Sequence, residues 1–381
     1  MSGRPPLGGA APAAVALIAA ALTAAYPGGA AAQARAAGAD YLYAAVQGEA
    51  AVAVVDMASL EVVARVELRE LGFTENAKPH HVAVSPDGSR WYLSLIGENR
   101  VLAFDGENRL LGSAEFEVPG MLALHPKGEV LFVGRSMSAV NPPARIGAIR
   151  TGPDAARMEV EEVDVFFPRP HALALSADGE RVYSASLGVN QLAAVDAGSG
   201  EMTLIDIPGE THAPVQFAVA PDGRTLVAST QLTGRLLVFD LEDPDHPTLR
   251  AEIPLGGQPW HPVYAPAGDV VYVGLKMENR VVAVDVARGA VVWSTEHPGL
   301  NHPHGSALSP DGRRLFISSN GPGGMQMGEP APDAGAGAGH GAHGAGRAAT
   351  GTVTVLDARD GTVLKVLELG ENVTGLGART R

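Results

Sequence analysis

The chain has 381 residues, of which 46% are hydrophobic and 18% charged, and its 42 acidic and 28 basic residues give a net charge of −14. This acidic balance argues against nucleic acid or an anionic membrane as a partner. The sequence has no cysteine, which excludes disulfides, thiolate metal sites and thiol nucleophiles and leaves histidine and methionine as nitrogen and sulfur ligands. The 47 glycines and 28 prolines are typical of many short strands joined by turns.

The N-terminus has the pattern of a secretory signal peptide. Arg4 is the only charged residue among the first 34, and an apolar run at about 10–26 is followed by the small-residue sequence Ala32-Gln33-Ala34. We expect residues 1–34 to be removed and residues 35–381 to form a single domain that is periplasmic or secreted. A retained membrane anchor is the alternative, but the run is shorter than the ~20 apolar residues that a span needs. We expect no membrane span after cleavage.

A short apolar strand followed by a Pro-Asp-Gly-like turn recurs six times along the rest of the chain, most clearly at 82–88. The glycines that close these turns are Gly88, Gly128, Gly179, Gly223, Gly268 and Gly312. Each turn leads into a β-branched or aromatic strand, then a third strand and a more polar fourth. In five repeats the third strand ends in aspartate, at Asp105, Asp196, Asp240, Asp285 and Asp357. Four strands in each 40–45 residues predict the blades of a β-propeller.

The two ends of the chain predict how the propeller closes. Residues 41–68 supply the second, third and fourth strands of a blade without a first strand, and the C-terminal sequence at 373–376 matches an inner strand with nothing after it. Pairing the two ends completes a seventh blade and leaves no exposed inner edge. The sequence therefore predicts an all-β, seven-bladed propeller closed by its N- and C-terminal strands.

The sequence Pro-x-x-Val-Ala-Val-Ser-Pro-Asp-Gly at 79–88, followed by an aromatic strand, resembles the YVTN repeats of bacterial YncE-like and surface-layer propellers. The resemblance covers nearly all of the chain after about residue 40, and it implies the fold but not the chemistry. The chain is also distantly similar to three propellers of known chemistry. These are the copper-cluster domain of nitrous oxide reductase, the haem d1 domain of cytochrome cd1 nitrite reductase, and the lactonase-type propellers.

Histidines recur where the inner strands begin. Nine residues before each turn glycine stands a proline, and seven of the twelve histidines lie within two residues of these prolines. Because the inner strands of a propeller all start at one end of its central channel, we expect these side chains to meet there. The candidate metal ligands are His80, His81, His171, His261 and His304, with His212, His302 and Met121 in support. The alternative is that each histidine packs and forms hydrogen bonds only within its own blade.

The ligand types predict which metal would bind. Several imidazoles at one site disfavour each other's protonation, and a bound cation would offset that cost. Neutral imidazole together with thioether sulfur favours copper, with zinc a less suitable ion. Further soft ligands lie in loops that join second and third strands, namely Met137, Met277, Met325 and Met327. The longest of these loops, at about 320–350, is a Gly/Ala-rich surface segment that also carries His340 and His343.

The resemblances lead to several hypotheses of function. A His-His pair followed by single histidines is similar to the nitrous oxide reductase propeller, but no cysteine-bearing electron-transfer domain is present and Met121 replaces a histidine. We therefore expect copper binding, storage, delivery or a redox role rather than nitrous oxide reduction, and we do not expect haem d1. A lactonase-like hydrolase, with Glu75, Arg169 and His171 as conceivable catalytic partners, is one alternative. A non-catalytic protein- or ligand-binding scaffold is another, so catalytic residues are not assigned.

These hypotheses imply two kinds of partner. One is a metal ion or a small ligand at the channel mouth, and the other is a periplasmic protein.

Overall fold

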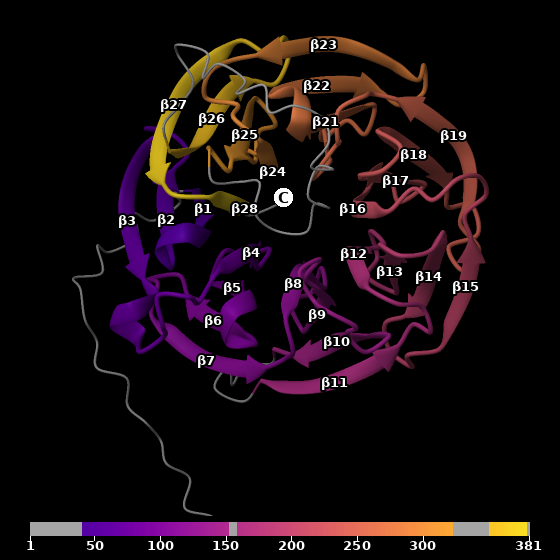
Figure 1. The fold of residues 1–381 in the computed structure, drawn as a ribbon, viewed down its shortest axis with the longest axis horizontal. Coiled ribbons are helices and arrows are strands. Elements are labelled where there is room, and N and C mark those ends of the chain that lie inside the picture. The colour runs from indigo at the N-terminus through magenta and orange to yellow at the C-terminus, as the bar shows by residue number, and fades with distance from the viewer. Residues whose placement is uncertain (1–39, 152–157, 323–349, 379–381) are drawn as a thin grey trace, which may run out of the picture.

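The computed structural model describes residues 40–151, 158–322 and 350–378. These residues form seven four-stranded antiparallel sheets around a central axis, so the predicted seven-bladed propeller is confirmed (Figure 1). None of the helices among them is long and apolar enough to cross a membrane. The expected signal peptide and the loop ligands Met325, Met327, His340 and His343 lie outside the described residues.

In six blades the strands follow chain order from the centre to the rim. The first two of these blades are β4 (Pro79–Val84), β5 (Arg90–Leu95), β6 (Arg100–Asp105) and β7 (Leu110–Glu115), then β8 (Pro119–Leu124), β9 (Val130–Arg135), β10 (Arg145–Arg150) and β11 (Glu159–Asp164). The next two are β12 (Pro170–Leu175), β13 (Arg181–Ser186), β14 (Gln191–Asp196) and β15 (Met202–Asp206), then β16 (Pro214–Val219), β17 (Thr225–Thr230), β18 (Arg235–Asp240) and β19 (Thr248–Pro254). The last two are β20 (Val263–Tyr264), β21 (Val270–Leu275), β22 (Arg280–Asp285) and β23 (Ala290–Glu296), then β24 (Pro303–Leu308), β25 (Arg314–Ser319), β26 (Gly351–Asp357) and β27 (Val363–Gly370).

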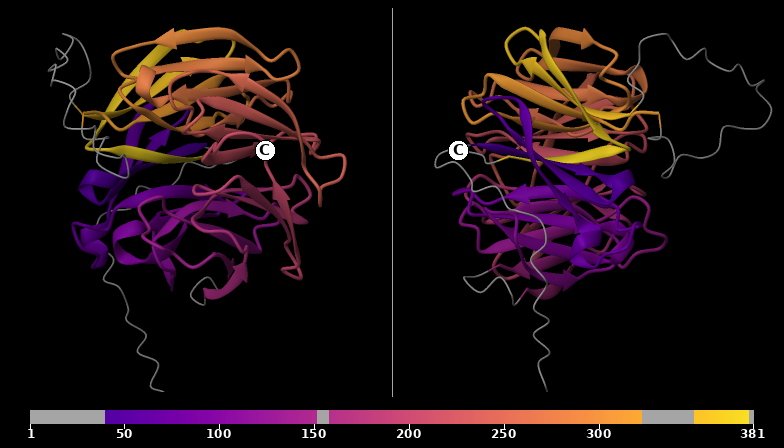
Figure 2. Two further views of the ribbon diagram at one scale, coloured as in Figure 1. Left: turned by 45° about the vertical axis from the view of Figure 1, so that its right-hand side comes forward. Right: turned by 90° about the vertical axis from the view of Figure 1, so that its left-hand side faces the viewer.

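The remaining blade joins the two ends of the chain. It is made of β28 (Val373–Ala378), β1 (Tyr41–Val46), β2 (Ala51–Asp56) and β3 (Glu61–Glu67), with β28 antiparallel to β1. In the side views the N-terminal strands, in indigo, lie beside the C-terminal strands, in yellow (Figure 2). The predicted closure is therefore confirmed.

Four short 3-10 helices complete the described secondary structure. They are η1 (Gln47–Glu49), η2 (Leu68–Leu71), η3 (Ile96–Glu98) and η4 (Lys276–Glu278). η1, η3 and η4 each join the second strand of a blade to the third, and this connection lies at the end of the blade where the inner strand begins.

The Pro-Asp-Gly turns are hairpins held by their own side chains. Asp87 accepts hydrogen bonds from the Ser85 hydroxyl at 2.6 Å and from the Ser89 amide at 2.9 Å. Gly88 has a φ of 68°, a left-handed conformation that glycine adopts at little cost. The turn sequence therefore fixes the register between the first and second strands of the blade.

The hydrophobic core lies between the faces of neighbouring blades. Trp91 on β5 is fully buried, with its ring centroid 4.0 Å from that of Phe104 in the same blade and 4.7 Å from that of Tyr43 in the next blade. Contacts of this kind hold adjacent sheets together.

One inner strand is shorter than the sequence predicts. β20 contains only Val263 and Tyr264, and Pro259 makes an isolated bridge to Leu275 before it. Pro262 has no amide hydrogen for the ladder, so the strand is interrupted between these two points.

Candidate functional site

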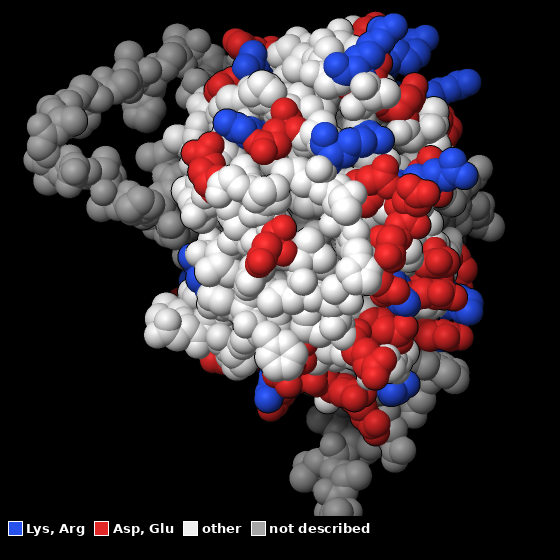
Figure 3. All heavy atoms as spheres, turned by 90° about the vertical axis from the view of Figure 1, so that its right-hand side faces the viewer, with Lys and Arg blue, Asp and Glu red and all other residues white. Residues whose placement is uncertain are grey.

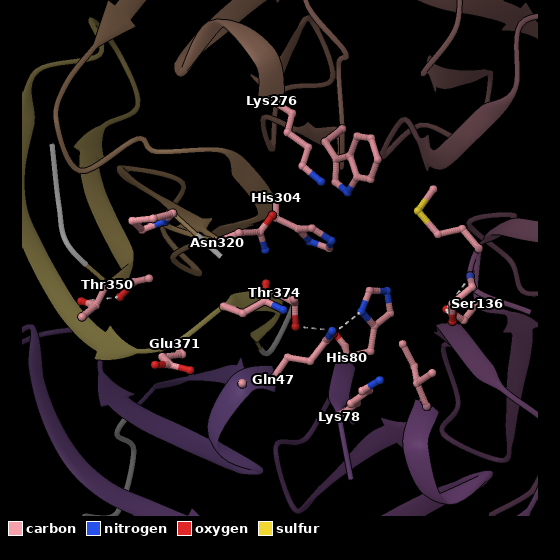
Figure 4. A pocket seen from close by; sticks show the side chains of 18 residues that line it. Gln47, Lys78, His80, Ser136, Lys276, His304, Asn320, Thr350, Glu371 and Thr374 are labelled. Carbon is pink, nitrogen blue, oxygen red and sulfur yellow. Dashed lines mark hydrogen bonds between the residues drawn. The ribbon is translucent and has the colours of Figure 1, made fainter. Parts of the chain in front are cut away.

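A cavity of about 500 Å³ lies at the end of the channel where the inner strands begin, and we call it the channel cavity (Figure 4). Its walls come from several blades. η1 contributes Gln47, the start of β4 contributes His80, the segment before β20 contributes Trp260, η4 contributes Lys276 and β24 contributes His304. Residues distant in sequence are therefore neighbours at this site, as the sequence predicts.

A repeated backbone feature aims the side chains at the channel. In five blades the residue directly before the inner-strand proline is not glycine and yet has a left-handed φ of 46–58°. These residues are Lys78, Val118, Arg169, Ala213 and His302. The left-handed region is unfavourable for such residues, most of all for a β-branched one, and strain of this kind clusters at functional sites. The left-handed residue turns the chain from the preceding loop into the inner strand. Nothing in the sequence pattern predicts this conformation.

Four of the predicted histidines form a contact cluster. The ring centroids of His261 and His304 are 4.7 Å apart, those of His80 and His304 are 5.4 Å apart, and those of His81 and His261 are 5.8 Å apart. His171 is also buried, and its charge would act on His80, His81 and His261. The five principal candidates therefore lie near one another, and two of them, His80 and His304, line the channel cavity.

All five imidazoles are neutral at pH 7. Burial, reinforced by the neighbouring histidines, lowers the pKa of His80 to about 3 and that of His81 to about 4. Burial likewise lowers the pKa of His171 to about 4 and brings the pKa values of His261 and His304 well below 6.5. Neutral imidazole is the form that binds a metal ion.

Hydrogen bonds fix the proton position on two of these rings. Nδ1 of His80 lies 3.0 Å from Oε1 of Gln47, and Nδ1 of His171 lies 2.8 Å from the carbonyl oxygen of Arg135. Because these oxygens accept hydrogen bonds, Nδ1 carries the proton and Nε2 keeps its lone pair. Metal-binding histidines are usually held in this way.

Two further rings of the cluster, those of His81 and His304, differ from the ring of His80. Nδ1 of His81 accepts a hydrogen bond from the amide of Leu122 at 3.3 Å, so the proton of neutral His81 is on Nε2 and that nitrogen has no lone pair to offer. Nδ1 of His304 is buried and has no hydrogen-bond partner among the described residues. His304 is therefore the histidine of the cluster whose bonding is incomplete.

The three supporting candidates lie outside the cluster. Both ring nitrogens of His212 are near oxygen atoms of its own blade, with Nδ1 2.9 Å from Oγ1 of Thr233. Nδ1 of His302 lies 3.3 Å from the carbonyl oxygen of Gly321. Met121 is fully buried in the apolar core between two blades. Met137, in contrast, does line the channel cavity.

Sequence reasoning missed several polar residues of the cavity, among them Gln47, Lys276 and Asn320. These three lie in connections between second and third strands, the same position from which the sequence analysis selected methionines. Nζ of Lys276 lies 4.4 Å from the ring centroid of Trp260. Aligning these connections for polar residues as well as for methionines would have found all three.

In the described part of the chain, no three His, Asp or Glu side chains are placed so that together they could hold a metal ion. The cluster in its present conformation is therefore a set of packed neutral rings.

The acidic residues lie mostly away from the cavity. The aspartates that end the third strands, such as Asp105 and Asp196, stand at the turn end of the blades, opposite the start of the inner strands. In the space-filling view, acidic side chains gather along one side of the molecule (Figure 3). Of the residues that line the channel cavity, by contrast, Lys78 and Lys276 are basic and Glu371 is acidic. The aspartates that end the third strands therefore lie at the end of the blades away from the cavity.

Comparisons with known proteins agree with this architecture. The family described as Lactonase, 7-bladed beta-propeller matches residues 30–250, which is more than half of the chain. No curated protein matches the sequence.

Solved structures with a similar fold include hydrazine synthase from Kuenenia stuttgartiensis. Its comparison with this chain gives a TM-score of 0.60 and 21% sequence identity, and the match covers 79% of this chain and 90% of the hydrazine synthase chain. Another is a functionally unknown protein from Desulfotomaculum acetoxidans, with a TM-score of 0.65 and 13% identity, for which the match covers 89% of this chain and 98% of that one. At these identities the likeness shows the fold alone.

Proposed function

The chain belongs to the seven-bladed β-propeller lactonase family, and from this starting point we propose that its channel cavity binds a transition metal ion, copper in preference to zinc. The observation that carries the proposal is the contact cluster of buried, neutral histidines contributed by three different blades. Five imidazoles whose pKa values are all lowered are poor general acids and bases at neutral pH. A ring such as that of His80, whose Nε2 keeps its lone pair, is suited to bind an ion that competes with protons for this lone pair.

The spacing of the rings supports a site formed by His80, His261 and His304. Two imidazoles that bind one ion at about 2.0–2.1 Å have ring centres roughly 4.5–5.2 Å apart when the ligand–metal–ligand angle is about 90–109°. The two measured separations among these three, 4.7 and 5.4 Å, are close to that value. Because the side chains are not placed to hold an ion as they stand, binding requires the rings to rotate about their side-chain torsions.

Copper is the ion that this set of ligands suits best. The thioether of Met137 lines the same cavity, and sulfur ligands of this kind favour copper over zinc. The secretory pattern at residues 1–34 supports a periplasmic or extracellular setting for this copper binding, storage, delivery or redox role.

Metal content tests the proposal directly. Mature protein purified without a His-tag and loaded with Cu(II) is expected to retain about one copper per chain by elemental analysis. A protein carrying both His261→Gln and His304→Gln is expected to retain none, while His246→Gln, which changes an exposed histidine on the rim, retains the wild-type amount. Equal copper in all three proteins, or none in the wild type, would contradict the proposal.

Lactone hydrolysis is the second candidate, because it is the activity in the family's name. The Lys276 ammonium group beside the cavity could polarise a lactone carbonyl. Of the conceivable catalytic partners, Glu75 is exposed and the Arg169 side chain donates to the carbonyl oxygen of Met137, 3.0 Å away. His171, with a pKa of about 4, is a weak general base at pH 7.

A hydrolysis assay decides between the two functions. Turnover of simple lactones by chelator-treated protein, lost in Lys276→Gln, would favour the hydrolase. Neither turnover nor copper binding would leave a non-catalytic, ligand- or protein-binding propeller.

A further inference from the structure

The channel cavity has room for an organic molecule. Its volume of about 500 Å³ lies in the range of small-molecule binding sites. Part of its wall is apolar and comes from Ile96, Met137 and Trp260, whereas most of the other lining residues are polar. The cavity therefore suits a molecule that carries both an apolar group and hydrogen-bonding groups.

Two of the residues that line the cavity carry buried polar atoms without a partner. Oδ1 of Asn320 and Nδ1 of His304 have no hydrogen-bond partner among the described residues, and the two residues are only 2% and 6% exposed. The Asn320 amide nitrogen already donates to the carbonyl oxygen of Val373 at 3.0 Å, so Oδ1 is left as an acceptor. Because buried polar groups are nearly always paired in native proteins, these atoms indicate a ligand that brings at least one N–H or O–H donor.

Residues of opposite charge lie on the two sides of Gln47. The backbone amide of Gln47 donates to the carbonyl oxygen of Asn372, the residue after Glu371, at 3.0 Å. Oε1 of Gln47 lies 3.0 Å from Nδ1 of His80, the residue two positions after Lys78. Glu371 and Lys78 therefore flank Gln47, and both line the cavity (Figure 4).

The charges of Glu371 and Lys78 are not paired with each other. Among the described residues, neither side chain has an oppositely charged group within 4.0 Å. Lys276 differs from Lys78, because its ammonium group already lies over the Trp260 ring, 4.4 Å from the ring centroid. Lys78 also has a left-handed φ of 51°, and backbone strain of this kind clusters at functional sites. A ligand with a positive and a negative end would match Glu371 and Lys78 together.

We propose that the channel cavity binds a short peptide with free ends, with its ammonium group at Glu371 and its carboxylate at Lys78. The amide N–H of the peptide donates to Oδ1 of Asn320, and a carbonyl oxygen of the peptide accepts a hydrogen bond from Nδ1 of His304. A free amino acid has both charged ends but no amide N–H, so it leaves Asn320 without a donor. Binding breaks no bond and needs no metal ion, so this inference does not rest on the proposed function.

Calorimetric titration of metal-free protein with the dipeptide alanyl-leucine tests the inference. Lys78→Gln is expected to weaken binding by about tenfold, because this lysine is half-buried and pairs with a carboxylate. Glu371→Gln is expected to weaken it by about threefold, because this glutamate is exposed. The matched controls Lys127→Gln and Glu180→Gln remove exposed charges from turns at the opposite end of the blades and should leave the affinity unchanged.

Changes to the peptide test each contact without altering the protein. N-acetyl-alanyl-leucine has no ammonium group, so its affinity should not respond to Glu371→Gln. Alanyl-leucine amide has no carboxylate, so its affinity should not respond to Lys78→Gln. The depsipeptide, in which an ester oxygen replaces the amide nitrogen, has no N–H for Asn320 and should bind about tenfold more weakly than alanyl-leucine.

The inference is overturned if alanyl-leucine does not bind the wild type, or if it binds Lys78→Gln and Glu371→Gln as tightly as the wild type. Leucine or the depsipeptide binding as tightly as alanyl-leucine would also contradict it, because the amide N–H would then make no contact. Copper uptake is measured in a separate titration, so a protein that binds copper but no dipeptide refutes only this inference. A protein that binds the dipeptide but no copper refutes only the proposed function.

Discussion

Metal-free protein is expected to lose stability steeply on mild acidification, because the histidine cluster must stay neutral when the chain is folded. The unfolded chain binds a proton on each histidine as the pH falls through about 6.5. In the folded state His171 does so only near pH 4 and His80 only near pH 3. The unfolded state therefore gains protons first, and the free energy of unfolding falls from about pH 6.5 downward until each folded pKa is reached.

The size of the effect follows from the same values. At pH 5 an unfolded histidine lies about 1.5 units below its pKa while His171 is still neutral in the fold, which costs about 2 kcal/mol at 1.36 kcal/mol per unit. His80 contributes a similar amount, so the two together lower the free energy of unfolding by about 4 kcal/mol between pH 7 and pH 5. That is a large fraction of the stability of an ordinary domain.

Urea unfolding at pH 7, 6 and 5, in the presence of a chelator, measures this loss. His171→Gln is expected to remove about 2 kcal/mol of the pH-dependent part, since glutamine does not titrate. His246→Gln, at an exposed position, is the matched control and should leave the pH dependence unchanged. A wild-type free energy of unfolding that is the same at pH 5 and pH 7 would refute the reasoning, because the imidazoles would then not be buried in neutral form.

Three further predictions concern the fold that holds the site. Trp91→Ala should lower the free energy of unfolding by about 3–5 kcal/mol in urea titrations, because a fully buried indole is lost between two blades. The control Phe166→Ser changes a side chain that is 72% exposed and should alter the free energy of unfolding by less than about 0.5 kcal/mol. A chain ending at residue 372 lacks β28 and should give no cooperative unfolding transition by circular dichroism; a wild-type transition would show that the closing strand is dispensable. Gly305→Ala should lower the free energy of unfolding by about 1–3 kcal/mol in urea titrations, because its Cβ would lie 2.7 Å from the Thr374 carbonyl oxygen. An unchanged urea midpoint would mean that β28 can shift to make room for the methyl group without loss of stability.

The fold could be predicted from the sequence because its signals are local and repeated. Each turn glycine, such as Gly88, marks a hairpin, and the regular spacing of these turns defines the blades before any long-range contact is considered. The closure could also be predicted, since the first strand of one blade is missing at the N-terminus and present at residues 373–378. The shortened β20 was not predicted, because the effect of Pro262 depends on which ladder bond its missing amide hydrogen would have made.

The site could be predicted only at the level of which positions converge. Strand order brings His80, His261 and His304 to one end of the channel, and the sequence analysis placed them there. It could not tell that Met121 turns into the core between blades, because the direction of one side chain at a strand start depends on the local φ and on packing. It also passed over Lys276, because it searched the connections between second and third strands for methionines and not for other polar side chains.

The histidine cluster depends on the closing strand β28, which is synthesised after every histidine of the cluster. Thr374 on β28 places its hydroxyl 3.2 Å from the carbonyl oxygen of His80, and a Cβ at Gly375 would clash with that same oxygen, so the last residues of the chain support one of the first residues of the site. Every histidine of the cluster has been synthesised by residue 304, yet the wall behind His80 is absent until β28 arrives about seventy residues later. The cavity therefore forms only once β28 has been synthesised, and a nascent or truncated chain that lacks β28 carries the histidines without the site.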